Sequence, residues 1–289
     1  MKIDIDLNCF FDGTLGYDLR SVNEYKKNLD LCQEASEKII AETKNKSNEI
    51  INSFSRNYQE KIKLQKLKIS EKKNKLVIGL GGSSAGAKAV NAYLEEGIYF
   101  FDNYDPGHLS NFFKNYNLKD FTIYIISKSG TTFETMAMLN LTYQHLIKIL
   151  TKEEIKKNLI IITEDSDNPL NNFAKKNDFQ LIAHNKKIGG RYSVFSEVGM
   201  ILFDLDALEI SSSAESVILK LIDKNQEDQS NPVVNAAVIL TLQKNNDIRF
   251  NINLLYEYTL KNYSYWFLQL FAESLGKDKK AITPMTSIC

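Results

Sequence analysis

Short apolar runs alternate with amphipathic segments through the middle of this chain. The runs, rich in β-branched and aromatic residues, cover residues 76–80, 98–101, 121–126, 159–163 and 179–182. Segments such as 131–150 lie between them, with apolar residues at helical spacing. This alternation indicates βαβ units and a parallel sheet. Because the runs 121–126 and 159–162 are apolar throughout, their strands are expected to be covered on both faces, as in a doubly wound α/β fold.

The flanking regions follow helical patterns. Residues 23–74 are polar and lysine-rich and contain no proline or glycine, which predicts helices that pack on another part of the chain. Later patterns predict helices over 194–208, 214–224, 232–244 and 258–275, the third opened by proline and the last ended by Gly276. Residues 249–255 read as a strand. Since a lone strand is unstable, we expect it to begin a second sheet.

These patterns predict three parts. They are a mainly helical segment over 1–74, a parallel-sheet domain over 75–190, and helices with the start of a second, incomplete domain over 191–289. After the proline at 284 the chain reaches Cys289 with no further element predicted.

The composition of the 289 residues, 43% hydrophobic and 25% charged, fits a globular protein. Lysine plus arginine (36) equals aspartate plus glutamate (36), so no net field attracts nucleic acid or an anionic membrane. Any phosphate must therefore be held locally. The apolar stretches end well short of the ~20 residues of a membrane span, and none is predicted.

Cysteine stands only at Cys9, Cys32 and Cys289, which fits neither a disulfide framework nor a zinc site. The N-terminus carries acidic residues where a signal peptide needs an apolar run. We therefore expect a cytoplasmic protein without a metal site.

The first glycine-rich loop runs from Gly79 to Gly86, after one predicted strand and before a helix, where backbone N–H groups can bind an anion. A dinucleotide fingerprint would need glycine where Ser84 stands, although Asp102 near the end of the next strand keeps that interpretation open. The phosphate-loop pattern fails, because Lys88 is displaced by one residue. A tight turn without a ligand is the alternative.

A second loop follows the third predicted strand. The hydroxyls of Ser127, Ser129, Thr131 and Thr132 and the Lys128 ammonium gather at a helix start, with no acid among these six positions. A phosphate monoester needs such donors and such a cation. Ordinary helix capping is the alternative. Because two loops of this kind follow neighbouring strands, phosphate binding is favoured.

Four segments together carry a resemblance to a known family. They are the two loops, the segment Gly189-Gly-Arg-Tyr-Ser193, and Gln269-Leu-Phe-Ala-Glu-Ser-Leu-Gly-Lys277. In order and spacing, from about residue 76 to 289, they resemble the glucose-6-phosphate isomerase family. The serine-rich loops alone would suggest only the wider sugar-isomerase (SIS) fold, a flavodoxin-like parallel-sheet domain. The last two segments are specific to the isomerase.

The resemblance implies an enzyme that interconverts glucose 6-phosphate and fructose 6-phosphate in glycolysis and gluconeogenesis, with no cofactor and no metal. It implies that Glu273 is the base and that Arg191, after Gly190, stabilises an enediolate. Gln269 would position the sugar's hydroxyls, and Gly82 would let backbone approach the ligand. It also implies a homodimer in the full-length form. The residues implied to hold the 6-phosphate are Ser83, Ser127, Lys128, Ser129 and Thr132.

The residues themselves agree with this chemistry. Moving a proton between adjacent carbons needs one carboxylate that reaches both and a fixed cation for the developing oxyanion. Arginine occurs only at Arg20, Arg56, Arg191 and Arg249, so an arginine at a motif position stands out. Taken alone, Glu273 reads as a solvated glutamate and Arg191 as an ion-pair residue. Gln269, four residues before Glu273, shares its helical face.

The sequence also departs from the family. The family's ring-opening histidine follows its Thr-Pro pair, here Thr283-Pro284, in an Asp-Gln-His-Ser segment, and a catalytic lysine comes near the family's C-terminus. Neither occurs here, so we expect an isomerase truncated within its second domain. His108, His145 and His184 are expected to be structural. Two alternatives stay open: a sugar-phosphate-binding module without turnover, and a glucose/mannose-type isomerase.

Overall fold

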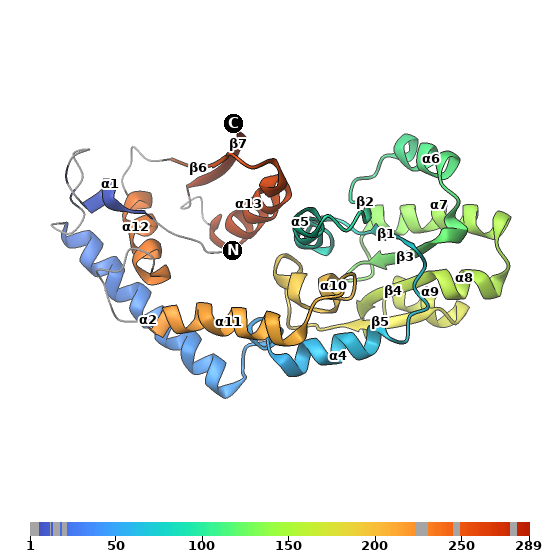
Figure 1. The fold of residues 1–289 in the computed structure, drawn as a ribbon, viewed down its shortest axis with the longest axis horizontal. Coiled ribbons are helices and arrows are strands. Elements are labelled where there is room, and N and C mark those ends of the chain that lie inside the picture. Colours follow the sequence, from blue (N-terminus) through green and yellow to red (C-terminus); the bar gives the residue numbers. More distant parts are fainter. Residues whose placement is uncertain are drawn as a thin grey trace.

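The computed structural model describes residues 6–11, 13, 18, 22–222, 231–244, 249–277 and 282–289. Its central sheet is parallel, with the strand order β2-β1-β3-β4-β5 (Figure 1). The predicted strands and their parallel arrangement are confirmed. The order reverses between β1 and β3, and ligands of doubly wound folds bind at such a switch point. The strands are β1 Asn74–Ile78, β2 Tyr99–Phe101, β3 Phe121–Ile126, β4 Leu159–Glu164 and β5 Gln180–His184.

Alternate residues of each strand enter two cores, one on each face of the sheet. Along β3, Ile123 and Ile125 join one core, whereas Tyr124 and Ile126 join the other. The first core is covered by α6 Pro106–Asn115, α7 Phe133–Ile149, α8 Lys152–Asn158 and α9 Pro169–Asn177. The second is covered by α4 Arg56–Lys66, α5 Ala85–Leu94 and α10 Glu197–Met200. The doubly wound prediction is therefore confirmed.

Several of the helices on the sheet begin at side-chain caps. Asp105 precedes α6, and its carboxylate accepts a hydrogen bond from the backbone N–H of His108 in that helix. Asn168 precedes α9, and its side chain accepts a hydrogen bond from the backbone N–H of Asn171. Each of these helices also has proline in its first turn, where a missing N–H costs nothing. At α8, Thr151 and Glu154 form a reciprocal capping box. Local sequence thus sets where α6, α8 and α9 begin.

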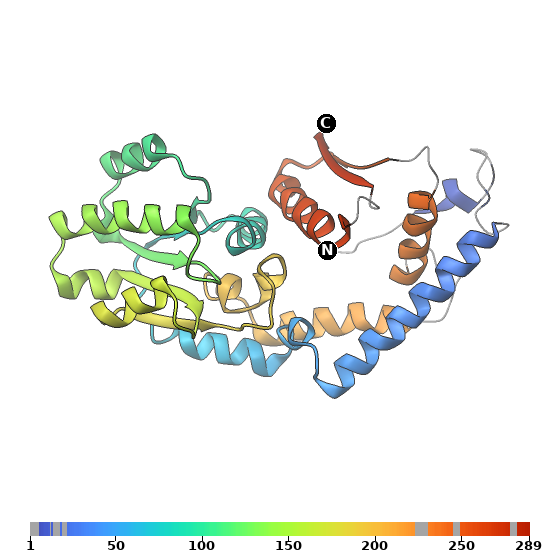
Figure 2. The ribbon, with the colours of Figure 1, turned by 180° about the vertical axis from the view of Figure 1, so that it is seen from behind.

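The N-terminal helices connect the sheet to a second helical group. Figures 1 and 2 show the long blue helix α2 beside α12 and the end of α11. Ser36 of α2 donates to the carbonyl of Leu221 at 2.6 Å, and Asn28 donates to Thr241 at 3.0 Å. Helices in 23–74 that pack on other elements are therefore confirmed. The helices of this region are α1 Asn8–Phe11, α2 Asn23–Asn45, α3 Glu49–Asn52, α11 Ala207–Ile222 and α12 Pro232–Lys244.

A second sheet forms near the end of the chain, as expected. It pairs β6 Phe250–Leu255 with β7 Thr283–Ile288 in parallel, joined through η5 Tyr258–Leu260 and α13 Lys261–Leu275. Strand β7 was not predicted, because Pro284 suggested that no element follows. Proline is tolerated at an edge, where its missing N–H removes no ladder hydrogen bond, and Pro284 lies opposite Asn251.

The predicted single helix over 194–208 is wrong. The chain forms η4 Gly190–Phe195, the short α10, and a turn before α11. The Ser196 side chain accepts a hydrogen bond from the backbone N–H of Val198 and caps α10, so a new helix begins there in a different direction. A Cβ on Gly199 would lie 2.1 Å from the carbonyl oxygen of Val194, so this tight packing depends on glycine. Residues 198 and 200–203 are all buried, and in the sequence such a run of apolar residues resembles a buried helix.

The predicted helix over 214–224 begins earlier, with α11 at Ala207, and its residues 223–224 lie outside the described residues. One further short helix, η3 Leu118–Asp120, leads into β3. Across the described ranges, no helix has the length and apolar character needed to cross a bilayer.

Candidate functional site

A cavity of about 330 Å³ opens at the carboxyl ends of β1 and β3, where the strand order reverses. Residues from both phosphate-type loops, the 190–191 segment and α13 line it. Every predicted site residue except Ser127 is among them. The lining residues are Leu80, Gly82, Ser83, Lys128, Ser129, Thr132, Glu164, Gly190, Arg191, Gln269 and Glu273.

The first loop forms η2 Gly81–Ser83 directly after β1, and α5 follows it. A Cβ on Gly82 would lie 2.3 Å from the carbonyl carbon of Gly190 and 2.6 Å from the nitrogen of Arg191. The Ser193 hydroxyl fixes this contact by bonding the carbonyls of Gly82 at 3.1 Å and Gly190 at 2.7 Å. Glycine at 82 therefore brings the first loop against the arginine-bearing segment.

Ser127 lies behind the cavity. Its side chain is buried, and its Oγ lies 3.0 Å from Oγ1 of Thr132, which lines the cavity. Ser129 Oγ similarly lies 2.9 Å from Oγ1 of Thr131. The hydroxyls of this loop thus form two ordered pairs at the start of α7, whose first backbone N–H groups carry positive partial charge.

Lys128 has an acidic neighbour that the local sequence pattern missed. Its Nζ donates to the carbonyl of Lys186 at 2.9 Å and lies 3.6 Å from Oε1 of Glu164. Glu164 ends β4 and also lines the cavity. Its position at the end of an apolar run next to the third strand was the available signal, because carboxyl ends of adjacent parallel strands share one edge.

Arg191 is held by groups of α13 and by its own neighbour. Its Nε donates to Ser274 Oγ at 3.0 Å, and Nη1 lies 3.5 Å from Glu273 Oε2. The guanidinium carbon lies 4.5 Å from the centroid of the Tyr192 ring. Trp266 donates its indole N–H to the Arg191 carbonyl at 3.0 Å. The sequence pattern did not single out Ser274, Tyr192 or Trp266 as individual site residues.

Glu273 and Gln269 face each other one turn apart on α13. Gln269 Nε2 donates to Glu273 Oε1 at 2.8 Å, and the Glu273 side chain is 48% exposed. The Oε1 atom of Gln269 is buried and has no hydrogen-bond partner within the described residues. A buried acceptor without a donor is costly, so this atom is suited to a donor supplied by a ligand.

Tyr192 shares the Ser274 hydroxyl with Arg191, its OH lying 2.7 Å from Ser274 Oγ. Burial raises the pKa of Tyr192, but the bonds to Ser274 and Arg191 and the arginine charge outweigh burial and leave the pKa below its ordinary value.

The three histidines lie elsewhere. His184 is buried and its Nδ1 lies 2.7 Å from Glu197 Oε1, His145 stacks on Phe113, and His108 contacts Phe101. None of them lines the cavity. Asp102, the residue that kept a dinucleotide interpretation open, pairs with Lys88 at 2.7 Å. Among the described residues, no three His, Cys, Asp or Glu side chains gather in a way that could hold a metal ion.

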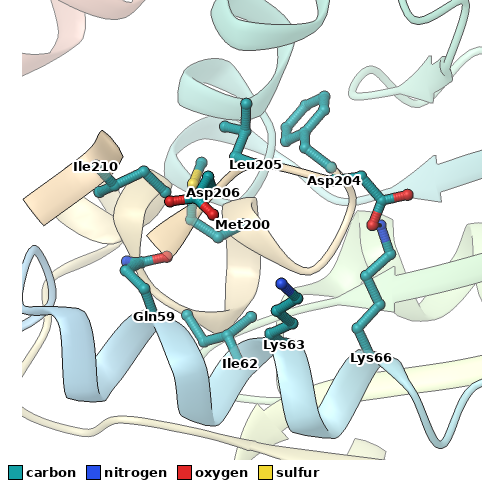
Figure 3. A pocket seen from close by; sticks show the side chains of 10 residues that line it. Gln59, Ile62, Lys63, Lys66, Met200, Asp204, Leu205, Asp206 and Ile210 are labelled. Atoms are coloured by element: carbon teal, nitrogen blue, oxygen red, sulfur yellow. Dashed lines mark hydrogen bonds and ion pairs between the residues drawn. The ribbon is translucent and has the colours of Figure 1, made fainter. Parts of the chain in front are cut away.

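A second polar pocket, also of about 330 Å³, lies between α4 and the segment before α11 (Figure 3). Gln59, Ile62 and Lys63 line its α4 side, and Lys66 forms a 2.7 Å ion pair with Asp204 at its rim. None of the predicted site residues lines this pocket.

A doubly wound parallel sheet with hydroxyl-rich loops at its switch point defines the class of α/β proteins that bind ligands at the carboxyl ends of their strands. The phosphoglucose isomerase family model matches residues 28–286. The chain therefore belongs to the phosphoglucose isomerase family.

Individual relatives agree with this assignment. The chain is 33% identical over 219 residues to a glucose-6-phosphate isomerase of Methanocaldococcus jannaschii, which covers 74% of this chain and 53% of that protein. It is 32% identical over 227 residues to that of Staphylococcus saprophyticus, covering 73% of this chain and 50% of the relative. The chain thus spans about half the length of the curated relatives it matches.

Solved structures share the fold. A hypothetical protein from Thermus thermophilus superposes with a TM-score of 0.70 at 23% identity, covering 98% of this chain and 67% of that one. A glucose-6-phosphate isomerase from Chlamydia trachomatis gives 0.63 at 21% identity, covering 80% of this chain and 47% of its own.

Proposed function

We propose that this cavity binds glucose 6-phosphate and fructose 6-phosphate and interconverts them through an enediolate, a step of glycolysis and gluconeogenesis. The observation that supports this most directly is the meeting of three separate segments around one cavity: the two hydroxyl loops, Gly190-Arg191, and the Gln269 and Glu273 pair. The named relatives, which are glucose-6-phosphate isomerases, support it independently.

The phosphate end of the site is formed by the two loops. Ser83, Ser129 and Thr132 donate hydroxyl hydrogen bonds, and Lys128 supplies the cation. Ser127 acts through Thr132, because its own hydroxyl is buried against it. The absence of a side chain at Gly82 keeps the loop backbone close to the ligand. Because the chain has no net charge, these local groups carry the recognition of the dianion.

The chemistry takes place at the other end. Glu273 removes the proton from C2 of the open-chain aldose, and the C2 electron pair forms the C1–C2 double bond while charge develops on O1. Arg191 stabilises this oxyanion. Glu273 then returns the proton to C1 while the O2–H bond breaks, the C2=O bond forms and O1 takes up a proton, which yields the ketose without any external oxidant. Gln269 holds Glu273 and accepts a sugar hydroxyl through its unpaired Oε1.

Ring opening has no histidine candidate at this cavity among the described residues. Among the described residues no histidine lines the cavity, and the family's Asp-Gln-His-Ser segment does not occur in the sequence. We therefore propose that these 289 residues bind the sugar phosphate and exchange its C2 proton, whereas the cyclic sugar opens slowly. The homodimer, the cytoplasmic location and the boundaries at residues 74 and 190 stay predictions.

The test follows deuterium from solvent into the sugar. The chain is incubated with fructose 6-phosphate in D₂O, and NMR measures exchange at C1 and formation of 2-deutero-glucose 6-phosphate. Glu273→Gln keeps the shape and loses the basicity, so exchange should fall by roughly 10²-fold or more. Glu215→Gln, at an exposed position of α11, is the matched control.

The outcomes separate the alternatives. Sugar-phosphate binding by the unaltered chain without any exchange would favour the binding module over the enzyme. Turnover of mannose 6-phosphate at a similar rate would favour the glucose/mannose type. Retained exchange in Glu273→Gln would assign the base to another residue.

A further inference from the structure

The Ser274 hydroxyl turns away from its own helix. Hydroxyls inside helices commonly bond the carbonyl four residues earlier, as Thr142 does to Met138 and Thr241 to Ala237. Ser274 instead reaches the 190–193 segment, where its Oγ accepts the Nε hydrogen of Arg191 at 3.0 Å. A serine kept only for helix packing needs no such contact.

This contact fixes the orientation of the guanidinium plane. Arg191 has five N–H donors in a rigid fork, so bonding Nε determines where the other donors point. Nη1 faces Glu273 and the ring of Tyr192 supports the face of the guanidinium. Arg191 also lines the cavity, and its bonds to Ser274 and Glu273 use Nε and Nη1. The guanidinium can therefore present its remaining edge, at Nη2, to a ligand.

Tyr192 in turn fixes the serine. Its OH lies 2.7 Å from Ser274 Oγ, so the Ser274 hydroxyl is bound on both sides. The chain Tyr192–Ser274–Arg191 orders a flexible side chain before any ligand arrives. Ordering an arginine beforehand lowers the conformational entropy lost on binding.

We propose that Ser274 is a positioning residue that aims the Arg191 guanidinium at the C1–C2 end of the sugar phosphate. It touches no reacting atom and acts through Arg191. The inference rests on the proposed function, since it assumes that the cavity binds an open-chain sugar phosphate in that orientation.

Two open-chain ligands isolate this role. 6-Phosphogluconate carries a carboxylate at C1, whereas glucitol 6-phosphate carries a neutral hydroxymethyl group there, and both share the phosphate. The ratio of their affinities, measured by calorimetry, reports the cation at the C1 end. The unaltered chain should bind the gluconate more tightly. Ser274→Ala should reduce that preference roughly tenfold, which is the size expected for one charge-assisted hydrogen bond. The affinity for glucitol 6-phosphate should stay within about twofold of the unaltered chain's.

Two variants act as controls. Ser274→Thr keeps a hydroxyl at this position and should restore most of the preference. Ser212→Ala removes an exposed helical hydroxyl that bonds only the carbonyl of Glu209, and it should change neither affinity. Unfolding temperatures of all variants show whether a loss reflects folding.

Each outcome decides between two claims. An unchanged gluconate preference in Ser274→Ala would overturn the positioning role. So would an equal loss of affinity for both ligands, because that indicates a general structural effect. If the unaltered chain binds neither ligand, the proposed function itself fails. This result is distinct from a failure of the Ser274 proposal, because it appears before any variant is compared.

Discussion

Gly82 and Gly190 meet backbone to backbone, so closely that a Cβ on Gly82 would lie 2.3 Å from the carbonyl carbon of Gly190. This contact joins the end of β1 to the segment that carries Arg191. If one of these two segments moved relative to the other, the distance between the side chains proposed to bind phosphate and the Arg191 guanidinium would change.

Gly82→Ala should therefore both destabilise the chain and weaken ligand binding. The added methyl group meets main-chain atoms, which cannot rotate away, so we expect a loss of about 1–3 kcal/mol in the free energy of unfolding. Urea unfolding measures it. Gly189→Ala is the matched stability control, because its Cβ would meet only the Tyr192 ring at 3.4 Å, an ordinary contact. Equal stability of the two variants would contradict the argument.

Ser127 and Thr132 should act as one unit in phosphate binding. Ser127→Ala removes the partner of the Thr132 hydroxyl and should weaken glucose 6-phosphate binding by about 1–2 kcal/mol. Since their hydroxyls lie 3.0 Å apart, the double variant with Thr132→Ala should lose less than the sum of the single losses. Calorimetric titration measures all three proteins.

The control for this cycle is Ser110→Ala, at an exposed position of α6, which should bind normally. Additive losses of binding free energy would show that Ser127 contacts the ligand independently of Thr132. Unchanged affinity in both single variants would show that this loop does not bind the phosphate.

The parts of the site that could be predicted are those that a local pattern fixes. Apolar runs bounded by glycine or hydroxyl residues located β1 and β3 and the loops after them, because strand burial and helix starts depend on a few adjacent residues. The resemblance then supplied Arg191 and Glu273. The structure brings both to the same cavity as the loops.

The parts that were missed depend on contacts between distant segments. Glu164 approaches Lys128 only because β3 and β4 are neighbours, and Ser274 meets Arg191 only through the packing of α13. The same limit explains the wrong helix over 194–208, where burial on all sides hid two changes of chain direction. Strand β7 was missed because proline normally argues against a strand.

Stability at low pH should depend on Glu197. Burial would raise the pKa of this carboxyl, but hydrogen bonds to His184 and to the Asn185 N–H outweigh burial and hold the pKa below its ordinary value. The folded chain thus binds fewer protons here than the unfolded chain. The stabilisation is complete above the unfolded pKa, about 4.3, and is lost as pH falls through the lower folded pKa.

The measurement compares the free energy of unfolding from pH 7 down to pH 3. Glu197→Gln should be less stable than the unaltered chain at pH 7, and the difference should narrow below about pH 4. The pKa of Asp204 is also lowered, by Lys66, but Asp204 is present in both proteins, so its contribution to the difference in unfolding free energy cancels. Glu215→Gln is the control with an exposed carboxyl. A difference that stays constant with pH would exclude a charge effect.

The second sheet should make the chain self-associate. Phe250, Ile252 and Leu254 project from one face of β6, each more than half exposed, and Met285 of β7 lies opposite Ile252 on the same face. A two-stranded sheet is marginal in water, and an exposed apolar face with open edges favours pairing with another copy. Sedimentation velocity should therefore show a mass that rises with concentration.

The double variant Ile252→Lys and Leu254→Lys places two charges on that face and should keep the chain monomeric at concentrations where the unaltered chain associates. Leu64→Lys with Leu67→Lys is the matched control, since both leucines are exposed at the end of α4, far along the chain from the second sheet. If the control variant also prevents association, scattered exposed leucines drive it instead of the β6 face. A chain that stays monomeric without any substitution would contradict the prediction that the exposed β6 face drives association.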